Sequence, residues 1–282
     1  MKKHTLRFIV LTAMIAMLAV ILACAGNIEP QTVPISVPYP EGFADTSITL
    51  EFGAASIYAD AIGSDLIEGN ITYNTEGRYP AVVVNDNSVS IVQGGPSGIV
   101  TGGTINNWVL HFGTEMPFSL EINAGAYSGE WKLGGLPLTA LTVNEGAASS
   151  TFSFSSANPE VMSELDINTG AGSMDLLDLA NANFDSFSYD GGAGSLTADF
   201  GGVLTHDEAV DINAGAASIA LIIPEETPAR IHIGGGAASI EADEGFERLD
   251  SDYSTPSWAG HEGPALEIEI TLVAGSLTLQ LE

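Results

Sequence analysis

Few residue types in this 282-residue chain could support chemistry, and the clearest of them is a single cysteine, Cys24. One cysteine excludes a disulfide within the chain and a cysteine-based metal site. The histidines beyond it show no metal-ligand spacing; they are His111, His206, His232 and His261. Carboxylates are too numerous for one catalytic pair to stand out. We therefore expect no catalytic residue, no metal ion and no cofactor.

Cys24 ends a segment that is typical of a bacterial signal peptide. The first seven residues include three basic ones, and an apolar run extends over residues 8–22. The sequence Ile21-Leu22-Ala23-Cys24 is similar to a lipobox, whose cysteine is lipidated and becomes the first residue of the mature protein. We predict lipid on Cys24 and a location outside the cytoplasm, anchored at a membrane. The alternative is an uncleaved transmembrane anchor over the same apolar run.

The charge of the remaining chain is strongly negative. Four basic and 36 acidic residues follow residue 23, which gives a formal charge of −32. Nucleic-acid binding requires the opposite charge and is excluded. An acidic surface attracts cations or basic partners and repels other copies of itself. The chain is nevertheless 45 % hydrophobic and has 32 glycines, which favours many short strands and turns over disorder.

A repeated pattern runs through most of the mature chain: apolar-polar-apolar-polar-x-Gly-Ala-x-Ser. Its alternation predicts a strand with one buried face, and the small residues predict a bend before a second strand. From Ser128 to Ser239 the closing serines lie 21 to 24 residues apart. The eight copies, of which the last is degenerate, occupy residues 48–56, 120–128, 141–149, 165–173, 187–195, 210–218, 231–239 and 266–276.

Each unit of about 22 residues predicts one rung of an all-β, glycine-rich, solenoid-like stack. Adjacent rungs would lie about 4.8 Å apart, so equivalent side chains would face each other. One outward position alternates acidic and non-acidic residues if the rungs stack in chain order: Glu121, Thr142, Asp166, Ser188, Asp211, His232 and Glu269. The next outward position predicts a ladder of amides: Asn123, Asn144, Asn168, Asp190 and Asn213. We expect both sets to serve the architecture.

Two segments interrupt the repeat. Residues 57–119 contain strand-like runs at 67–73, 81–84, 89–92 and 108–112, with a hairpin turn expected at 85–88. Residues 243–264 are expected to form a long loop. Before the first repeat, prolines at 30, 34, 38 and 40 favour an extended spacer. The predicted organisation is a signal peptide (1–23), a Pro-rich tether (24–45), an N-terminal β subdomain (46–118) and a repeat β-stack (119–282).

The sequences LEFGAASI at 50–57 and LIEGNITY at 66–73, with the later Ile-Asn-x-Gly-Ala-x-Ser units, resemble the toast-rack family. This family is related to the putative-adhesin domains and to the extracytoplasmic part of LiaF-like cell-envelope proteins. The resemblance covers nearly the whole mature chain. It implies a β-stack outside the membrane, with roles in adhesion or envelope-stress sensing. It transfers no functional residue, because the matched motif contains none.

These observations predict a non-enzymatic surface lipoprotein of the cell envelope, adhesin-like or associated with envelope stress. Its expected partners are the membrane, through lipid on Cys24, and a cell-wall or cell-surface ligand. Two alternatives stay open. An enzyme acting on envelope polysaccharide is suggested by the solenoid-like architecture alone, and a calcium-dependent surface protein is suggested by the many acidic side chains.

Overall fold

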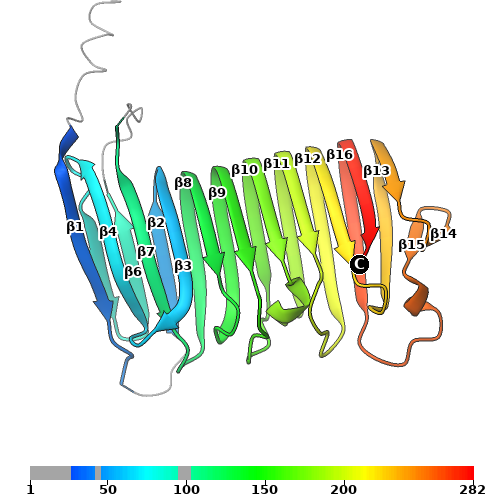
Figure 1. The fold of residues 1–282 in the computed structure, drawn as a ribbon, viewed down its shortest axis with the longest axis horizontal. Coiled ribbons are helices and arrows are strands. Elements are labelled where there is room, and N and C mark those ends of the chain that lie inside the picture. The colour runs from blue at the N-terminus through cyan, green and yellow to red at the C-terminus, as the bar shows by residue number, and fades with distance from the viewer. Residues whose placement is uncertain (1–26, 42–45, 95–102) are drawn as a thin grey trace, which may run out of the picture.

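The computed structural model describes residues 27–41, 46–94 and 103–282, so the predicted signal peptide and Cys24 lie outside the described residues. The described strands form one continuous sheet that is drawn out into an elongated stack (Figure 1). The first strands are β1 (Asn27–Val37), β2 (Thr46–Phe52), β3 (Ala55–Gly63), β4 (Ile67–Thr75), β5 (Pro80–Asn85), β6 (Ser88–Gln93) and β7 (Asn106–Gly113). The repeat strands are β8 (Phe118–Lys132), β9 (Leu138–Ser153), β10 (Leu165–Leu177), β11 (Ser186–Asp199), β12 (Glu208–Ile223), β13 (Ala229–Ala242) and β16 (Leu266–Leu281). The short elements are β14 (Glu247–Leu249), β15 (Asp252–Ser254) and two 3₁₀ helices, η1 (Leu179–Ala182) and η2 (Pro256–Trp258).

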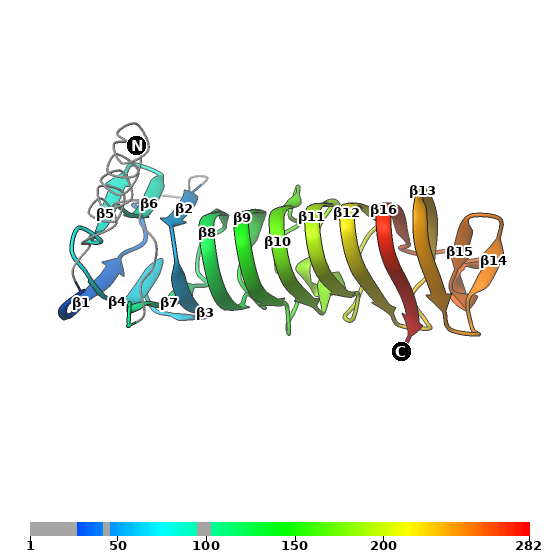
Figure 2. The same ribbon diagram turned by 90° about the horizontal axis from the view of Figure 1, so that it is seen from above.

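The repeat strands β8 to β12 lie side by side, parallel and in chain order, as the 22-residue period predicts. Equivalent repeat positions are in register, so that Ser149 is opposite Ser128 and Ser173 is opposite Ser149. Seen from above, each long strand curves around the stack, and a loop returns the chain to the start of the next rung (Figure 2). The predicted all-β, solenoid-like repeat stack is confirmed.

The first glycine of each Gly-Ala-x-Ser unit occupies a position where neighbouring backbones crowd together. A Cβ atom added to Gly146, Gly170, Gly192 or Gly215 would lie 2.3–2.8 Å from the carbonyl oxygen of the preceding rung's glycine. Strand pairing skips this glycine and resumes at the alanine that follows. The repeated glycine is therefore required by the close approach of adjacent rungs at the bend.

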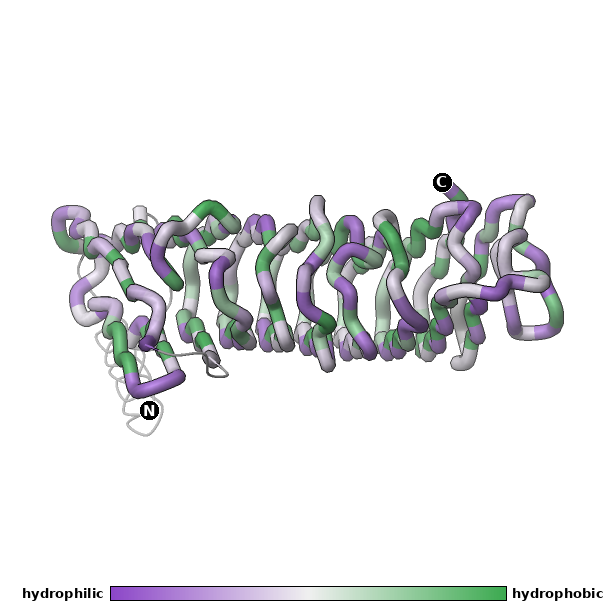
Figure 3. Tube along the Cα trace, turned by 90° about the horizontal axis from the view of Figure 1, so that it is seen from below, coloured by the Kyte–Doolittle hydropathy of each residue, from purple (hydrophilic) through white to green (hydrophobic). Residues whose placement is uncertain are grey.

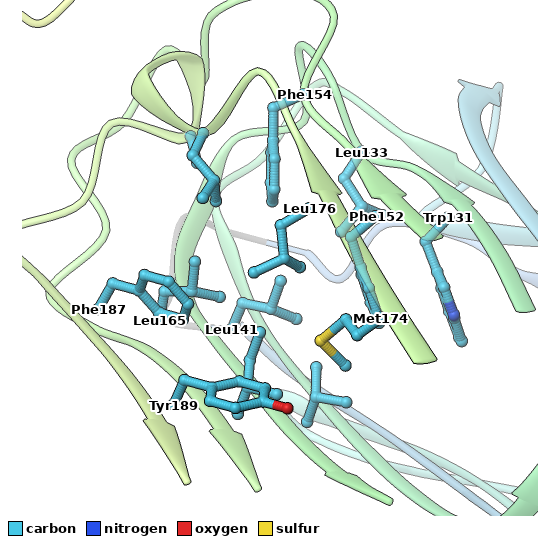
Figure 4. Packing of buried hydrophobic residues seen from close by; sticks show 14 of the residues in the cluster. Trp131, Leu133, Leu141, Phe152, Phe154, Leu165, Met174, Leu176, Phe187 and Tyr189 are labelled. Atoms are coloured by element: carbon cyan, nitrogen blue, oxygen red, sulfur yellow. The ribbon is translucent and has the colours of Figure 1, made fainter. Parts of the chain in front are cut away.

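The core lies inside the curve of the rungs and follows the alternation in the sequence, which Figure 3 shows as successive hydrophobic and hydrophilic positions along each strand. Equivalent buried residues of neighbouring rungs pack on one another (Figure 4). Trp131 and Phe152 stack with ring centroids 5.6 Å apart, and Leu176 of the next rung occupies the same position. The return loops add buried Leu133, Phe154 and other side chains, each worth about 1.5–3 kcal/mol when fully buried.

The N-terminal part begins as one more rung and then divides. β2 pairs with the first half of β8 and β3 with its second half, so together they continue the repeat. Beyond them, one branch continues through β7 and β4 to β1, and the other continues through β6 to β5. The expected strands over residues 57–119 and the hairpin at 85–88 are confirmed. Both branches share a single hydrophobic core with the repeat strands.

The Pro-rich tether predicted for residues 24–45 is wrong over residues 27–37. This segment is β1, which pairs antiparallel with β4 and buries Ile35 and Val37. Proline lacks a backbone N–H, but an edge strand bonds to a neighbour on one side only, so Pro30 and Pro34 are tolerated there. The prolines are therefore compatible with an edge strand, and they do not make this segment a free spacer.

The rungs do not keep chain order at the C-terminal end. β16 pairs in parallel with β12 on one side and with β13 on the other, so the last repeat of the sequence lies between two earlier ones. Residues 243–264, expected to be a loop, contain the β14–β15 hairpin, whose second strand pairs with β13. Period determines which residues share a face, but it does not determine which rungs are neighbours. Stacking in chain order, the condition for the alternation of acidic residues, therefore does not hold at this end.

Candidate functional site

Three rows of polar side chains run along the outside of the stack, one residue per rung. The first is the expected acidic row. Glu121 lies opposite Thr49 and Thr142, and Asp166 lies opposite Thr142 and Ser188, so acidic residues alternate with non-acidic ones through β12. This part of the prediction is confirmed, and it keeps like charges from facing each other.

The second row is the amide ladder, which the structure also confirms. Asn144 donates from Nδ2 to Asn123 Oδ1 at 3.0 Å, and Asn168 donates to Asn144 Oδ1 at 3.2 Å. Each amide thus links its own rung to the preceding one. At Asp190 the ladder changes, and Asn213 donates instead to Asp211 of its own strand at 2.8 Å.

The third row consists of the exposed serines that close each repeat. Ser173 Oγ lies 3.3 Å from Ser149 Oγ, and Ser276 Oγ lies 3.2 Å from Ser218 Oγ. The sequence predicted only that a small residue is needed at this position. In the structure these two pairs of hydroxyls also hydrogen-bond between rungs. The serine row forms a polar strip on the outside of the strands' second halves.

The acidic row changes at the C-terminal end because β16 is inserted between β12 and β13. Asp211 lies opposite Glu269, and Glu269 lies opposite His232. Two acidic residues thus face each other on neighbouring strands about 4.8 Å apart, a contact that stacking in chain order would have avoided. A shallow hollow of about 580 Å³ opens here, and its polar lining includes Asp211, Glu267, Glu269, Arg230 and His232. We call these five residues the C-terminal cluster.

Arg230 and His232 of the C-terminal cluster share one carboxylate from β15. Arg230 donates to Asp252 Oδ2 from Nη2 at 2.5 Å and from Nε at 3.1 Å. His232 Nδ1 lies 2.7 Å from Asp252 Oδ1. The hydrogen bonds from Arg230 and then from His232 hold the pKa of Asp252 below its usual value, and Asp252 raises the pKa of Arg230. The structure thus brings Arg230 and His232 together on one carboxylate.

The C-terminal cluster leaves three carboxylates, Asp211, Glu267 and Glu269, on the wall of an open hollow in which Arg230 and His232 are already paired with Asp252. Its field is suited to attracting a positively charged group. Among the described residues, no group of three or more His, Cys, Asp or Glu side chains has the geometry to hold a metal ion. The arrangement is thus an electronegative surface feature.

The other histidines within the described ranges each have a partner and lie apart from the C-terminal cluster. His111 Nδ1 is 2.6 Å from Asp60 Oδ1, and His206 Nε2 is 3.3 Å from Asp185 Oδ1. His261 Nδ1 is 2.7 Å from the carbonyl oxygen of Trp258.

Sequence reasoning missed a buried carboxyl at the bend of the stack. Glu145 points inward from β9, where Tyr127 donates its hydroxyl to Glu145 Oε2 at 2.8 Å and Ser150 donates at 3.3 Å. Burial raises the pKa of Glu145 and of Tyr127. Burial, followed by the charge of Glu145, raises the pKa of Tyr189 to about 12. The alternation Leu141-x-Val143-x-Glu145 placed this residue on the buried face and could have revealed it.

A second buried carboxyl starts strand β12. Glu208 is 2 % exposed, and neither of its carboxyl oxygens meets a hydrogen-bond donor in good geometry within the described part of the chain. Burial raises the pKa of Glu208 to about 9, so the side chain is protonated at neutral pH. Glu208 alternates with Val210 and Ile212, and this pattern could have revealed in the sequence that it faces inward.

No helix in residues 27–41, 46–94 or 103–282 has the length and apolar character needed to cross a membrane. Of the solved structures, a putative cell adhesion protein from Clostridium sporogenes ATCC 15579 has 18 % sequence identity and a TM-score of 0.52, over 90 % of this chain and 100 % of that chain. A putative adhesin from Bacteroides fragilis NCTC 9343 has 9 % identity and a TM-score of 0.34, over 89 % of this chain and 97 % of that chain. At such identity the first of these likenesses shows the fold alone.

No curated protein matches the chain. The family model of the N-terminal domain of toast_rack, DUF2154, matches residues 28–160 and 156–222. The match begins with β1, which the structure places in the sheet, and it extends into the repeat strands as far as β12. Since it covers more than half of the sequence, the chain belongs to the toast-rack family.

Proposed function

We propose that this chain is a non-enzymatic, adhesin-like binding module of the bacterial cell envelope. The observation that supports this proposal is the set of three outward rows along the stack, whose rungs lie about 4.8 Å apart: hydroxyl and amide groups recur on neighbouring rungs, and carboxylates recur on every second rung. A surface with a regular period is suited to an extended ligand that also repeats, such as a cell-wall glycan. The structural similarity to a putative cell adhesion protein also supports an adhesin-like function.

Lipid on Cys24 is the second part of the proposal. β1 begins at Asn27, so two residues lie between Cys24 and the sheet, and the Cα atoms of Cys24 and Asn27 are at most about 10 Å apart. β1 and the C-terminal cluster lie toward opposite ends of the stack (Figure 1). A lipid on Cys24 would thus hold the β1 end close to the membrane and direct the C-terminal cluster away from it.

Retention on envelope material tests the binding function. The full chain, purified in mild detergent, is mixed with isolated cell-wall glycan and with membranes, and the bound fraction is measured by sedimentation. We expect retention on the glycan that is lost when Ser149, Ser173 and Ser195, three members of the serine row, are replaced together by tyrosine. Equal loss on replacing exposed Val203, which lies in a return loop, would argue against a specific surface. No retention on any envelope fraction would remove the proposal.

Labelling of growing cells with a lipid probe tests the anchor. We expect label on the wild-type chain and none on Cys24→Ala. Equal labelling of both would return the uncleaved-anchor interpretation to favour.

The C-terminal cluster makes an enzyme the second candidate, because its carboxylates and Arg230 converge on one hollow. Incubation of the purified chain with envelope polysaccharide, followed by an assay for new sugar ends, would detect such an activity. Loss of that activity in Glu269→Gln would replace the binding proposal by a catalytic one. A calcium titration by calorimetry, with heat that disappears in the same variant, would favour the calcium-dependent version.

A further inference from the structure

Strand β5 presents an exposed, uncharged edge. Within the described residues it pairs only with β6, so its other side has free backbone groups. The sequence from Tyr79 to Val84 contains no charged residue. Val82, Val83 and Val84 are 40 %, 46 % and 56 % exposed, although successive side chains point to opposite faces. Both faces of this strand and one of its edges are therefore open.

The other two edge strands of the sheet, β1 and β14, differ from β5 in ways that prevent edge-to-edge pairing. The edge strand β1 carries Pro30 and Pro34, which lack an N–H group. The edge strand β14 has three residues, two of which, Glu247 and Arg248, are charged. Natural sheets use proline, charge and short length to keep edges from joining. β5 has proline at its first position and none of these devices in its centre.

The pairing with β6 determines which backbone groups of β5 are free. The two strands are joined by the two-residue loop Asp86–Asn87, so Asn85 and Ser88 flank the loop as a hydrogen-bonded pair. Bonded and non-bonded positions alternate along an antiparallel strand. The N–H and C=O groups of Val82 and Val84 therefore point to the open edge.

We propose that two copies of this chain associate by antiparallel pairing of their β5 strands about a twofold axis through Val83. In this register Val82 of each copy exchanges two backbone hydrogen bonds with Val84 of the other, and the two Val83 side chains face each other. Asp86 of each copy then lies opposite uncharged Pro80 of the other. The interface is isologous and closes at two copies.

Charge and shape favour a second copy as the occupant of this edge. The acidic surface repels other copies elsewhere, whereas the Tyr79–Val84 strip is neutral. Val82 and Val84 also line a hollow of about 590 Å³, whose lining is apolar at Val37, Pro38 and Leu66 and acidic at Glu41 and Asp86. Twofold pairing places the two hollows on the same face of the joined sheet, so that their valine walls adjoin. A six-residue edge buries much less than the ~800 Å² per partner of a standard interface, so the dimer should dissociate on dilution.

A charge exchange at Val83 tests the proposal in the full chain, purified in mild detergent and measured by sedimentation over a range of concentrations. We expect the wild type to approach the mass of two chains as concentration rises. Val83→Glu and Val83→Lys should each stay monomeric, because like charges would face each other across the axis. An equimolar mixture of the two variants should regain the dimer, which also shows that both are folded. The control Val161→Glu, at an exposed loop position, should dimerise like the wild type.

Several results would overturn the proposal. A wild type that stays monomeric at the highest concentration would leave the β5 edge to another occupant, such as an extended apolar peptide. Dimerisation of Val83→Glu alone would show that any association uses a different surface. A mixture that stays monomeric, although each variant has the wild-type circular dichroism spectrum, would show that residue 83 does not face itself. None of these outcomes bears on envelope binding, which is measured separately.

Discussion

The middle of the stack and its C-terminal end are built from the same repeat, yet they differ in what the outward residues do. From β8 to β12 the rungs follow chain order and acidic residues alternate with neutral ones, and from β8 to β10 amides bond from rung to rung. At the end, β16 lies between β12 and β13, and Asp211 meets Glu269. A regular repeat therefore produces a regular surface only while sequence neighbours are spatial neighbours. Where the order of the rungs changes, charged residues that are far apart in the sequence become neighbours.

The largest expected loss of stability concerns a glycine that is crowded by the neighbouring rung, compared with an equivalent glycine that is not. A methyl group on Gly192 would lie 2.3 Å from the carbonyl oxygen of Gly170 in the neighbouring rung. Gly236 is the equivalent residue of β13, and nothing lies within 4 Å of the place where its Cβ would be. Gly192→Ala should lower the free energy of unfolding by about 3 kcal/mol, the upper end for overpacking. Gly236→Ala should leave it nearly unchanged. Urea unfolding of both variants measures this, and equal losses would contradict the role given to rung contact.

The substitution expected to raise stability is at Glu208, and its effect depends on pH. Its folded-state pKa of about 9 lies far above the value of about 4.3 for an unfolded glutamate. The folded chain therefore keeps a proton that the unfolded chain releases, so the contribution of Glu208 to stability is greatest below pH ~4 and falls as the pH rises to 9. The slope due to this one group is about 1.4 kcal/mol per pH unit between those values.

Glu208→Gln should remove that slope and be more stable than the wild type at pH 8. Urea unfolding at several pH values from 5 to 8 compares the two chains. Glu225→Gln, at an exposed position just after β12, is the control and should keep the wild-type slope. Parallel pH profiles for wild type and Glu208→Gln would contradict a buried, protonated Glu208.

A smaller difference is expected along the amide row. Asn144 bonds to the amides of both neighbouring rungs, whereas Asn213 donates only to Asp211 of its own strand. Asn144→Ala should lower the free energy of unfolding by about 1–2 kcal/mol, and Asn213→Ala by about half of that. Thermal unfolding of the two variants checks the order, and a larger loss at Asn213 would contradict the ladder.

The smallest expected effect concerns the paired charges at the C-terminal end. Asp252→Asn removes the partner of Arg230 and His232, all at exposed or half-exposed positions. Water screens such exposed pairs, so the loss of stability should be small and should shrink further in high salt. Unfolding at low and high salt measures this, and a large salt-independent loss would show that Asp252 has a packing role.

Much of this architecture was predictable because alternation directly reports which residues face inward. The rungs and the amide row follow from this alternation. The glycine bend and the hairpin at 85–88 follow from the small and turn-forming residues that interrupt it. β1 was missed because proline density was interpreted as a spacer, although an edge strand tolerates Pro30 and Pro34. The C-terminal cluster could not be predicted, because rung order depends on long-range pairing that a local pattern does not encode. Glu145 and Glu208 could have been found, since both fall at inward positions of their strands.

Disulfide trapping along the serine row tests the altered rung order most directly. In a Cys24→Ala background, Ser218→Cys with Ser276→Cys joins positions whose hydroxyls are 3.2 Å apart, and Ser149→Cys with Ser173→Cys is a control from the middle of the stack. Ser218→Cys with Ser239→Cys spans two rungs, about 9.6 Å, beyond the reach of a disulfide. We expect mild oxidation to close the first two pairs and leave the third open. Closure of Ser218–Ser239 in place of Ser218–Ser276 would restore chain order and contradict the assembly of the C-terminal cluster.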